Sequence, residues 1–192
     1  ELLGLDNRLA DAEVIAVDDG STDDTWRLIK STQKIHGLRL THNCGQSAAI
    51  YAGLLRAQGD ICVIMDGDGQ NDPASIPGML DALIESKADV VCGFRAQRKD
   101  SLNRKVASRV ANAVRQLFFK DGVRDTGCSL KAFRREAVEL LVPFNGLHRF
   151  LPAIFRHAGL TIREFPVNHR PRSGGVTKYT NWERALRGCY DL

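Results

Sequence analysis

The chain has 192 residues, of which 43% are hydrophobic and 26% charged, and its formal net charge is +4. These values are ordinary for a single globular domain, and no apolar run reaches the ~18 residues that a membrane span requires. The charge is too small and too spread out to indicate a nucleic-acid-binding protein, so we expect anionic small ligands and no nucleic acid.

In chain order, the first half alternates β-rich runs with helical segments, the pattern of a parallel sheet covered by helices. Strands are expected at residues 14–18, 38–41, 61–65 and 89–94. Helices are expected at residues 23–33 with Thr22 or Asp23 as the cap, at 47–57, from Pro73 onward and at 102–119. The apolar run 61–65 is typical of a central strand that is buried on both faces.

After Gly127 the alternation breaks down, and a second α/β half is expected. Its strands are predicted at residues 129–133 and 161–167, and its helices at 135–141, 150–157 and after Asn181. We therefore predict one domain over residues 1–192, made of the halves 1–127 and 128–192.

Five cysteines are spread along the chain, an odd number without zinc spacing or the density of a disulfide framework. A reducing compartment is the simpler interpretation. Cys62 and Cys92 lie in apolar runs, where a free cysteine acts as a small hydrophobe. No basic segment followed by an apolar one opens the chain, so no signal peptide is predicted.

The strongest local signal is Asp66-Gly67-Asp68, followed by Gln70, at the carboxyl end of the apolar run 61–65. Open α/β sheets bind ligands at this end of their strands. Two carboxylates one residue apart can hold Mg²⁺ or Mn²⁺ together with diphosphate oxygens, which would stabilise a departing diphosphate. The alternative is a polar loop whose aspartates cap the turn and the helix at Pro73.

A second signal is the run from Val17 to Thr25, VDDGSTDDT, which passes from a strand through a glycine turn into a helix. A capped helix explains Ser21, Thr22 and Asp23. The adjacent Asp18 and Asp19 exceed what a cap needs and could accept hydrogen bonds from a base or ribose. From these residues alone, both interpretations stay open.

Together these segments resemble the family-2 glycosyltransferases of GT-A fold, and most closely their polyprenyl-phosphate branch, which includes dolichyl-phosphate mannosyltransferases. The resemblance covers Val14 to Tyr179 in the expected order. Its pieces are DDGSTDDT, NCGQ before an alanine-rich helix, MDGDGQNDP, GFR at 93–95, DTGC at 125–128 and RSGGVTKY at 172–179.

The resemblance implies an α/β, Rossmann-like, mostly parallel central sheet flanked by helices. It assigns the nucleoside-sugar donor to Asp18 and Asp19, the ribose or sugar side to Asp66, and the Mg²⁺ or Mn²⁺ ion to Asp68 and Gln70, with Asp66 beside it. The basic residues Arg172 and Lys178 would face the donor diphosphate, since a closing loop can bring both against phosphate oxygens. A solvated basic loop is the alternative for these two.

On the acceptor side, the resemblance assigns the acceptor phosphate to Arg95 and Arg109. For Arg109, the wet face of a long helix is the alternative. Asp125 would lie beside the donor sugar, either as a positioning group or as a general base. A phosphate acceptor is already ionised at neutral pH, so it can attack the anomeric carbon without a base and invert the configuration.

The chain departs from the family pattern because the family's first strand is missing, which leaves a sheet edge exposed. Residues 182–192 combine aromatic and basic side chains, which suits either a helix at a membrane surface or a packing helix. We expect peripheral attachment to the cytoplasmic face of a membrane.

The predicted function is transfer of a hexose from a GDP-mannose or UDP-glucose type donor to a polyprenyl or dolichyl phosphate. One rival is a related transferase acting on a saccharide hydroxyl, which needs a base. Another is a non-catalytic module that binds nucleotide sugars. A nucleotidyltransferase is disfavoured, because the chain lacks a glycine-rich, basic phosphate-binding signature near its start. Oligomeric state has no sequence signal.

Overall fold

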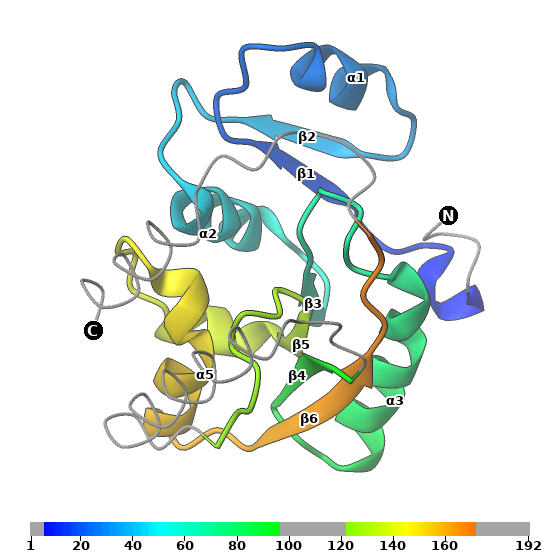
Figure 1. Cartoon of the computed structure of the whole chain (residues 1–192), viewed down its shortest axis with the longest axis vertical. Helices are drawn as coiled ribbons and strands as arrows, with labels where there is room; N and C mark the ends of the chain where they lie inside the picture. The colour runs from blue at the N-terminus through cyan, green and yellow to red at the C-terminus, as the bar shows by residue number, and fades with distance from the viewer. Residues whose placement is uncertain (1–5, 97–121, 172–192) are drawn as a thin grey trace.

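The computed structural model describes residues 6–96 and 122–171 of the chain (Figure 1). The helices expected at residues 102–119 and after Asn181 lie outside this part. Within it, no helix is both long enough and apolar enough to cross a bilayer.

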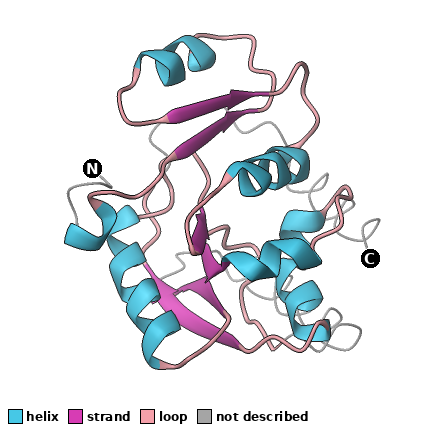
Figure 2. Ribbon diagram, turned by 180° about the vertical axis from the view of Figure 1, so that it is seen from behind, coloured by secondary structure: helices cyan, strands magenta, loops and turns pink. Residues whose placement is uncertain are grey.

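The described strands form two separate sheets. In the smaller one, β1 (Ile15–Asp18) and β2 (His36–Arg39) run parallel. The larger sheet has the order β3-β5-β4-β6, from the strands β3 (Ile61–Ile64), β4 (Val90–Arg95), β5 (Lys131–Arg134) and β6 (Ile162–Val167). Figure 2 shows the smaller sheet standing apart from the larger one.

All six predicted strands are present, within two residues of their expected bounds, and the α/β class is confirmed. The larger sheet is more mixed than the expected mostly parallel sheet. β5 pairs antiparallel with both β3 and β4, whereas β4 and β6 are parallel. β5 lies between β3 and β4, which run in the same direction. The first residues of β5 therefore lie beside the last residues of both neighbours.

The expectation of a central strand at 61–65 is wrong. β3 lies at the end of the sheet order, and only Cys62 of its four residues is buried. The described residues supply no strand partner for its second edge, whereas β4 and β5 have neighbours on both sides. Those two strands carry the most buried runs of the sheet.

The helices follow the expected order, with small shifts. They are α1 (Thr25–Ser31), α2 (Gln46–Arg56), α3 (Ile76–Glu85) after the 3-10 turn η3 (Pro73–Ser75), the 3-10 helix η4 (Arg135–Leu140) and α5 (Leu147–His157). The predicted cap of α1 is corrected, because Asp24 holds the cap position without a side-chain bond. Asp23 instead accepts the Thr25 N–H at 3.0 Å, which still satisfies a free donor of the first turn.

Helices cover both faces of the larger sheet (Figure 1). On one face, α3 buries Met79 and Leu83 in a core with strand residues. On the other face, α5 packs Phe155 against Phe133 of β5, with ring centroids 5.2 Å apart. Fully burying side chains of this size stabilises the fold by about 1.5–3 kcal/mol each, so these two layers hold the larger sheet.

Helix α2 connects the two sheets. Its Leu54 belongs to the core on the α5 side of the larger sheet. Its neighbour Gly53 lies against β1, where a Cβ atom would come within 3.1 Å of a Val17 methyl group. The smaller sheet is therefore positioned relative to the larger one through α2.

Asp89 joins the starts of β4 and β6. Its Oδ2 accepts the Thr161 N–H at 2.8 Å and the Thr161 hydroxyl at 2.7 Å. These two hydrogen bonds, the backbone one first, lower the pKa of the Asp89 carboxyl below its ordinary value. A lowered folded-state pKa means that the ionised group stabilises the fold above about pH 4, and that this contribution disappears as the pH falls through the lowered pKa.

We expect Asp89→Asn to lower the free energy of unfolding by about 1 kcal/mol at pH 7, because one charge-assisted acceptor is weakened. The difference in free energy of unfolding between Asp89→Asn and the wild-type protein should become smaller as the pH falls from 7 to 3. Urea denaturation at both pH values measures it, with the exposed Asp11→Asn as the control. A deficit that stays constant with pH would contradict the assigned ionic contribution.

Candidate active site

Loops from four strands meet at one edge of the larger sheet. β3, β4 and β6 run in the same direction and end there, and the antiparallel β5 begins there. The strand ends bring Asp66, Arg95 and His169 to this edge, together with the turn at residues 125–128. Residues more than 100 positions apart in the sequence therefore share one site.

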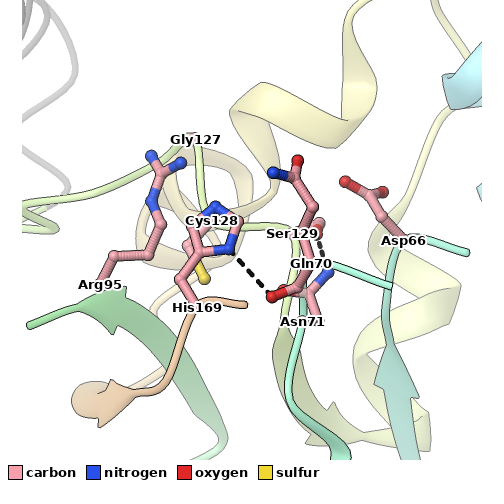
Figure 3. A pocket seen from close by; sticks show the side chains of 8 residues that line it. All are labelled: Asp66, Gln70, Asn71, Arg95, Gly127, Cys128, Ser129 and His169. Atoms are coloured by element: carbon pink, nitrogen blue, oxygen red, sulfur yellow. Dashed lines mark hydrogen bonds between the residues drawn. The ribbon is translucent and has the colours of Figure 1, made fainter. Parts of the chain in front are cut away.

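A cavity that is open to solvent lies at this edge, with about 270 Å³ of free space when the adjoining solvent is included. Figure 3 shows Asp66 and Arg95 on opposite sides of it, with His169 between them. Its lining residues are Asp66, Gln70, Asn71, Arg95, Gly127, Cys128, Ser129 and His169. A carboxylate at one end and a guanidinium at the other suit a ligand that carries both hydroxyl and phosphate groups.

The predicted metal ligands lie on the loop that follows β3. Asp66 and Gln70 line the cavity, and Asp66 Oδ1 accepts a hydrogen bond from Gln46 Nε2 at 2.7 Å. Asp68 Oδ1 accepts the Gln70 N–H at 3.0 Å. The turn at Pro73 is capped by Asp72, which accepts the Ala74 N–H. The capping alternative therefore accounts for Asp68, which caps the turn, and for Asp72, which caps the helix start, but not for Asp66, which contacts Gln46.

The carboxylate and amide oxygens of this loop are of the kind that binds a hard divalent cation. Among the described residues, no three His, Cys, Asp or Glu side chains are grouped as a metal site. Mg²⁺, however, is usually held by one or two carboxylates and completes its shell with water and substrate phosphates. Two aspartates and an amide oxygen match that requirement in kind. Asp66 and Gln70 line the cavity, whereas Asp68 is not among its lining residues, so the metal role of Asp68 stays a prediction.

Asp18, predicted to bind the donor, ends β1 with its side chain fully enclosed. Its Oδ1 accepts the Ser21 N–H at 2.9 Å. Its Oδ2 lies 3.2 Å from Arg39 Nε, but no described residue gives it an aligned hydrogen bond. A buried carboxylate oxygen of this kind is costly, and it would gain from a further N–H or O–H donor.

Asp19 anchors the turn before α2. Its two carboxylate oxygens accept the N–H groups of Cys44 at 2.7 Å and Gly45 at 2.9 Å. The close approach of the two loops depends on Gly20, which has a φ of 67° and lies where a Cβ atom would be 2.5 Å from the His42 carbonyl carbon. Asp19 therefore has a structural role in holding this turn, and its contact with the nucleoside-sugar donor stays a prediction.

Arg95 and Asp125, predicted for different roles, form one ion pair. Arg95 Nε and Nη2 donate to the two Asp125 oxygens at 2.8 and 2.7 Å, and the Arg95 N–H adds a third bond at 3.2 Å. Both side chains are largely buried, with exposed fractions of 17% and 14%. The sequence did not predict this pairing.

Three residues that the sequence analysis did not select also line the cavity: Asn71, Ser129 and His169. Asn71 Nδ2 donates to Ser129 Oγ at 2.8 Å, and His169 Nδ1 lies 2.9 Å from the Gln70 carbonyl. A carbonyl only accepts, so Nδ1 carries the hydrogen in this contact. The available signal was the position of His169 just after a predicted strand and three residues before Arg172.

The first turns of α2 and α5 meet beside this site. The buried Ser47 Oγ accepts the Gly146 N–H at 3.1 Å and lies 2.8 Å from His148 Nδ1. Ser47 directly follows Gln46, the residue that contacts Asp66. The segment around His148 is therefore tied to the donor half of the site.

The turn at residues 125–128 is held from beneath by a buried lysine. Lys131 is 1% exposed, and its Nζ donates to the Cys128 carbonyl. Burial raises the pKa of the Cys128 thiol above its ordinary value, so this cavity-lining sulfur stays protonated at neutral pH. Cys62 and Cys92 are buried, as predicted.

The remaining predicted residues, Arg109, Arg172 and Lys178, lie outside the described part of the chain. Their assignment to the acceptor phosphate and to the donor diphosphate stays a prediction.

Comparison with known proteins places the chain in a family. The family model described as "Glycosyl transferase family 2" matches residues 5–141. The undecaprenyl-phosphate 4-deoxy-4-formamido-L-arabinose transferase of Yersinia pestis (strain Pestoides F) is 36% identical over 185 residues, and that of Salmonella paratyphi B is 35% identical. Both alignments cover 94% of this chain and 56% of the relative, so the chain spans about half the length of these curated relatives.

Solved structures share the fold. Glucosyl-3-phosphoglycerate synthase from Mycobacterium tuberculosis, in complex with Mn²⁺, UDP-glucose and phosphoglyceric acid, superposes with a TM-score of 0.68 at 21% identity, covering 89% of this chain and 66% of that one. Another structure of that enzyme gives a TM-score of 0.65 at 27% identity, covering 88% and 64%. The family model, the sequence relatives and the shared GT-A fold together show that this chain belongs to glycosyltransferase family 2.

Proposed function

We propose that the protein containing this chain transfers a hexose from a nucleoside-diphosphate sugar, of the GDP-mannose or UDP-glucose type, to a polyprenyl phosphate. The observation that carries the proposal is the cavity with Asp66 on one side and Arg95 on the other. It occurs in a chain related to enzymes named as undecaprenyl-phosphate sugar transferases.

In this proposal the donor occupies the side of the cavity formed by the loop after β3. Asp66, Asp68 and Gln70 would hold Mg²⁺ or Mn²⁺, which would supply positive charge for the departing diphosphate. Support comes from the hard oxygen ligands of these residues and from the fold neighbours solved with Mn²⁺ or Mg²⁺. Arg172 and Lys178 are proposed as further diphosphate contacts.

Asp18 and Asp19 are proposed to serve the nucleoside end of the donor. The Asp18 side chain is fully enclosed and lies 3.2 Å from Arg39 Nε, so its role rests on its position at the end of β1 and not on an oxygen open to a ligand. Asp19 contributes by holding the turn before α2, which sets the position of Gln46 against Asp66.

The acceptor phosphate is proposed to bind Arg95, with Arg109 as its second contact. A fork-shaped guanidinium can bind two phosphate oxygens at once. An ionised phosphate oxygen needs no general base and can attack the anomeric carbon directly, with inversion. This fits an Asp125 carboxylate whose oxygens are already occupied by Arg95, and it makes a saccharide hydroxyl the less suitable acceptor.

We further propose one catalytic domain over residues 1–192, at the cytoplasmic face of a membrane, with a nucleotide-sugar-binding half at 1–127 and an acceptor-side half at 128–192. The proposed contacts cross this division, since Arg95 of the first half would bind the acceptor phosphate and Arg172 of the second half the donor diphosphate. The membrane placement is supported by the lipid-linked acceptor that the names of the relatives state.

The decisive experiment incubates the full-length protein with a panel of labelled nucleotide sugars, Mn²⁺ and polyprenyl phosphate. We expect label to enter the lipid fraction with one of the donors. Parallel reactions contain a free oligosaccharide in place of the lipid. Label transferred to the oligosaccharide alone would favour the hydroxyl-acceptor rival, and donor binding without any transfer would favour a non-catalytic module.

The metal role predicts the effect of Asp68→Ala. We expect metal-dependent donor affinity to fall by about a hundredfold, because one of two carboxylate ligands is lost. Calorimetric titration of donor with and without Mn²⁺ measures this. The matched control is Asp60→Ala, which removes an exposed aspartate at the opposite end of β3. Wild-type affinity in Asp68→Ala would refute the assignment.

A further inference from the structure

The geometry of the Arg95–Asp125 pair points to a role for Asp125 beyond those considered so far. The carboxylate presents two oxygens to the Nε and Nη2 edge of the guanidinium, at 2.8 and 2.7 Å. A phosphate group uses the same edge when it binds arginine in a bidentate manner. Asp125 therefore fills the place that two phosphate oxygens would take.

Of the two residues in this pair, Arg95 is the one that lines the cavity. Arg95 and Gly127 line the cavity, and Asp125 is not among the described residues that do so. Gly127 lets the guanidinium lie close to the turn, since a Cβ atom there would be 3.1 Å from Arg95 Nη2. An entering anion thus meets the guanidinium before it meets the carboxylate.

Exchange of partners requires little rearrangement. Asp125 Oδ2 also accepts the backbone N–H of Arg95, at 3.2 Å, so the carboxylate keeps a donor when the guanidinium turns away. The turn itself stays fixed by the bond from Lys131 to the Cys128 carbonyl. Among the described contacts of this pair, the exchange requires movement of the Arg95 side chain and leaves the turn in place.

We propose that Asp125 is a specificity-determining residue, which occupies the Arg95 guanidinium until the phosphate dianion of the acceptor displaces it. The inference rests on the proposed function and assigns Asp125 a task there other than that of a base. A phosphate monoester carries about −1.5 to −2 charges at pH 7 and can compete with a single carboxylate, whereas a neutral hydroxyl cannot. The pair thereby selects phosphate acceptors over sugars and water.

A neighbouring ion pair provides the matched control. Arg124 Nε and the Arg124 backbone N–H each donate to one oxygen of Glu164, both at 2.8 Å, so this pair also combines a guanidinium donor with a backbone donor. Neither residue lines the cavity. Glu164→Gln therefore removes one negative charge from a similar pair without freeing a group in the site.

The test titrates inorganic phosphate into the full-length protein by calorimetry. We expect Asp125→Asn to bind phosphate about tenfold more tightly than wild type, since the competing carboxylate is gone. Asp125→Ser serves as a second charge-free variant, in case the first folds poorly. Adding Arg95→Ala should remove the gain, and Glu164→Gln should not produce it. Unchanged or weaker phosphate binding in the Asp125 variants overturns the proposal, as does a gain that survives Arg95→Ala.

Kinetics with polyprenyl phosphate separate this role from general-base catalysis. We expect the acceptor KM of Asp125→Asn to fall and kcat to change by less than about tenfold, whereas loss of a base lowers kcat by about 10²–10⁴ and alters the acidic limb of the pH profile. The latter result overturns the inference but leaves the proposed transfer intact. Absence of transfer by the wild-type protein rejects the proposed function. The phosphate titration still decides whether Asp125 competes with phosphate for the Arg95 guanidinium.

Discussion

The direction of β5 determines where the whole site lies. Because β5 runs antiparallel between β3 and β4, its first residues and the turn at 125–128 lie at the edge where β3 and β4 end. This single arrangement puts the carboxylate of Asp66, the guanidinium of Arg95 and the backbone of Gly127 around one cavity. A parallel β5 would carry the same turn to the opposite edge of the sheet, and the acidic and basic halves of the site would be separated.

The parts of the fold that the sequence predicted are those encoded by local patterns. Each strand is a short β-rich run bounded by turn residues, and Asp66 was selected because it directly follows such a run. The position of β3 at the end of the sheet order was not predictable, because an apolar run does not reveal which strands will lie beside it. The cap of α1 was predicted at Thr22 or Asp23 and lies at Asp24, because several neighbouring residues of this segment are favourable caps.

The site was only partly predictable for a different reason. Arg95 and Asp125 were both selected, but the bond between them joins residues 30 positions apart and follows from strand pairing alone. His169 was set aside because no other histidine stands at ligand spacing from it. Its place beside Gln70 arises from the bridge between Asn71 and His169, a contact across 98 residues that leaves no periodic mark in the sequence.

The first turn of α2 serves as a common reference for three distant segments. The turn before it is fixed by Asp19, Gln46 reaches Asp66, and Ser47 reaches Gly146 and His148. Each residue of an α-helix advances the side-chain direction by about 100°, so one residue inserted between Gln46 and Ser47 would separate the directions of the two contacts that these neighbours make. The first turn of α2 can therefore tolerate neither insertion nor deletion, whereas the loop ahead of it does not carry this constraint.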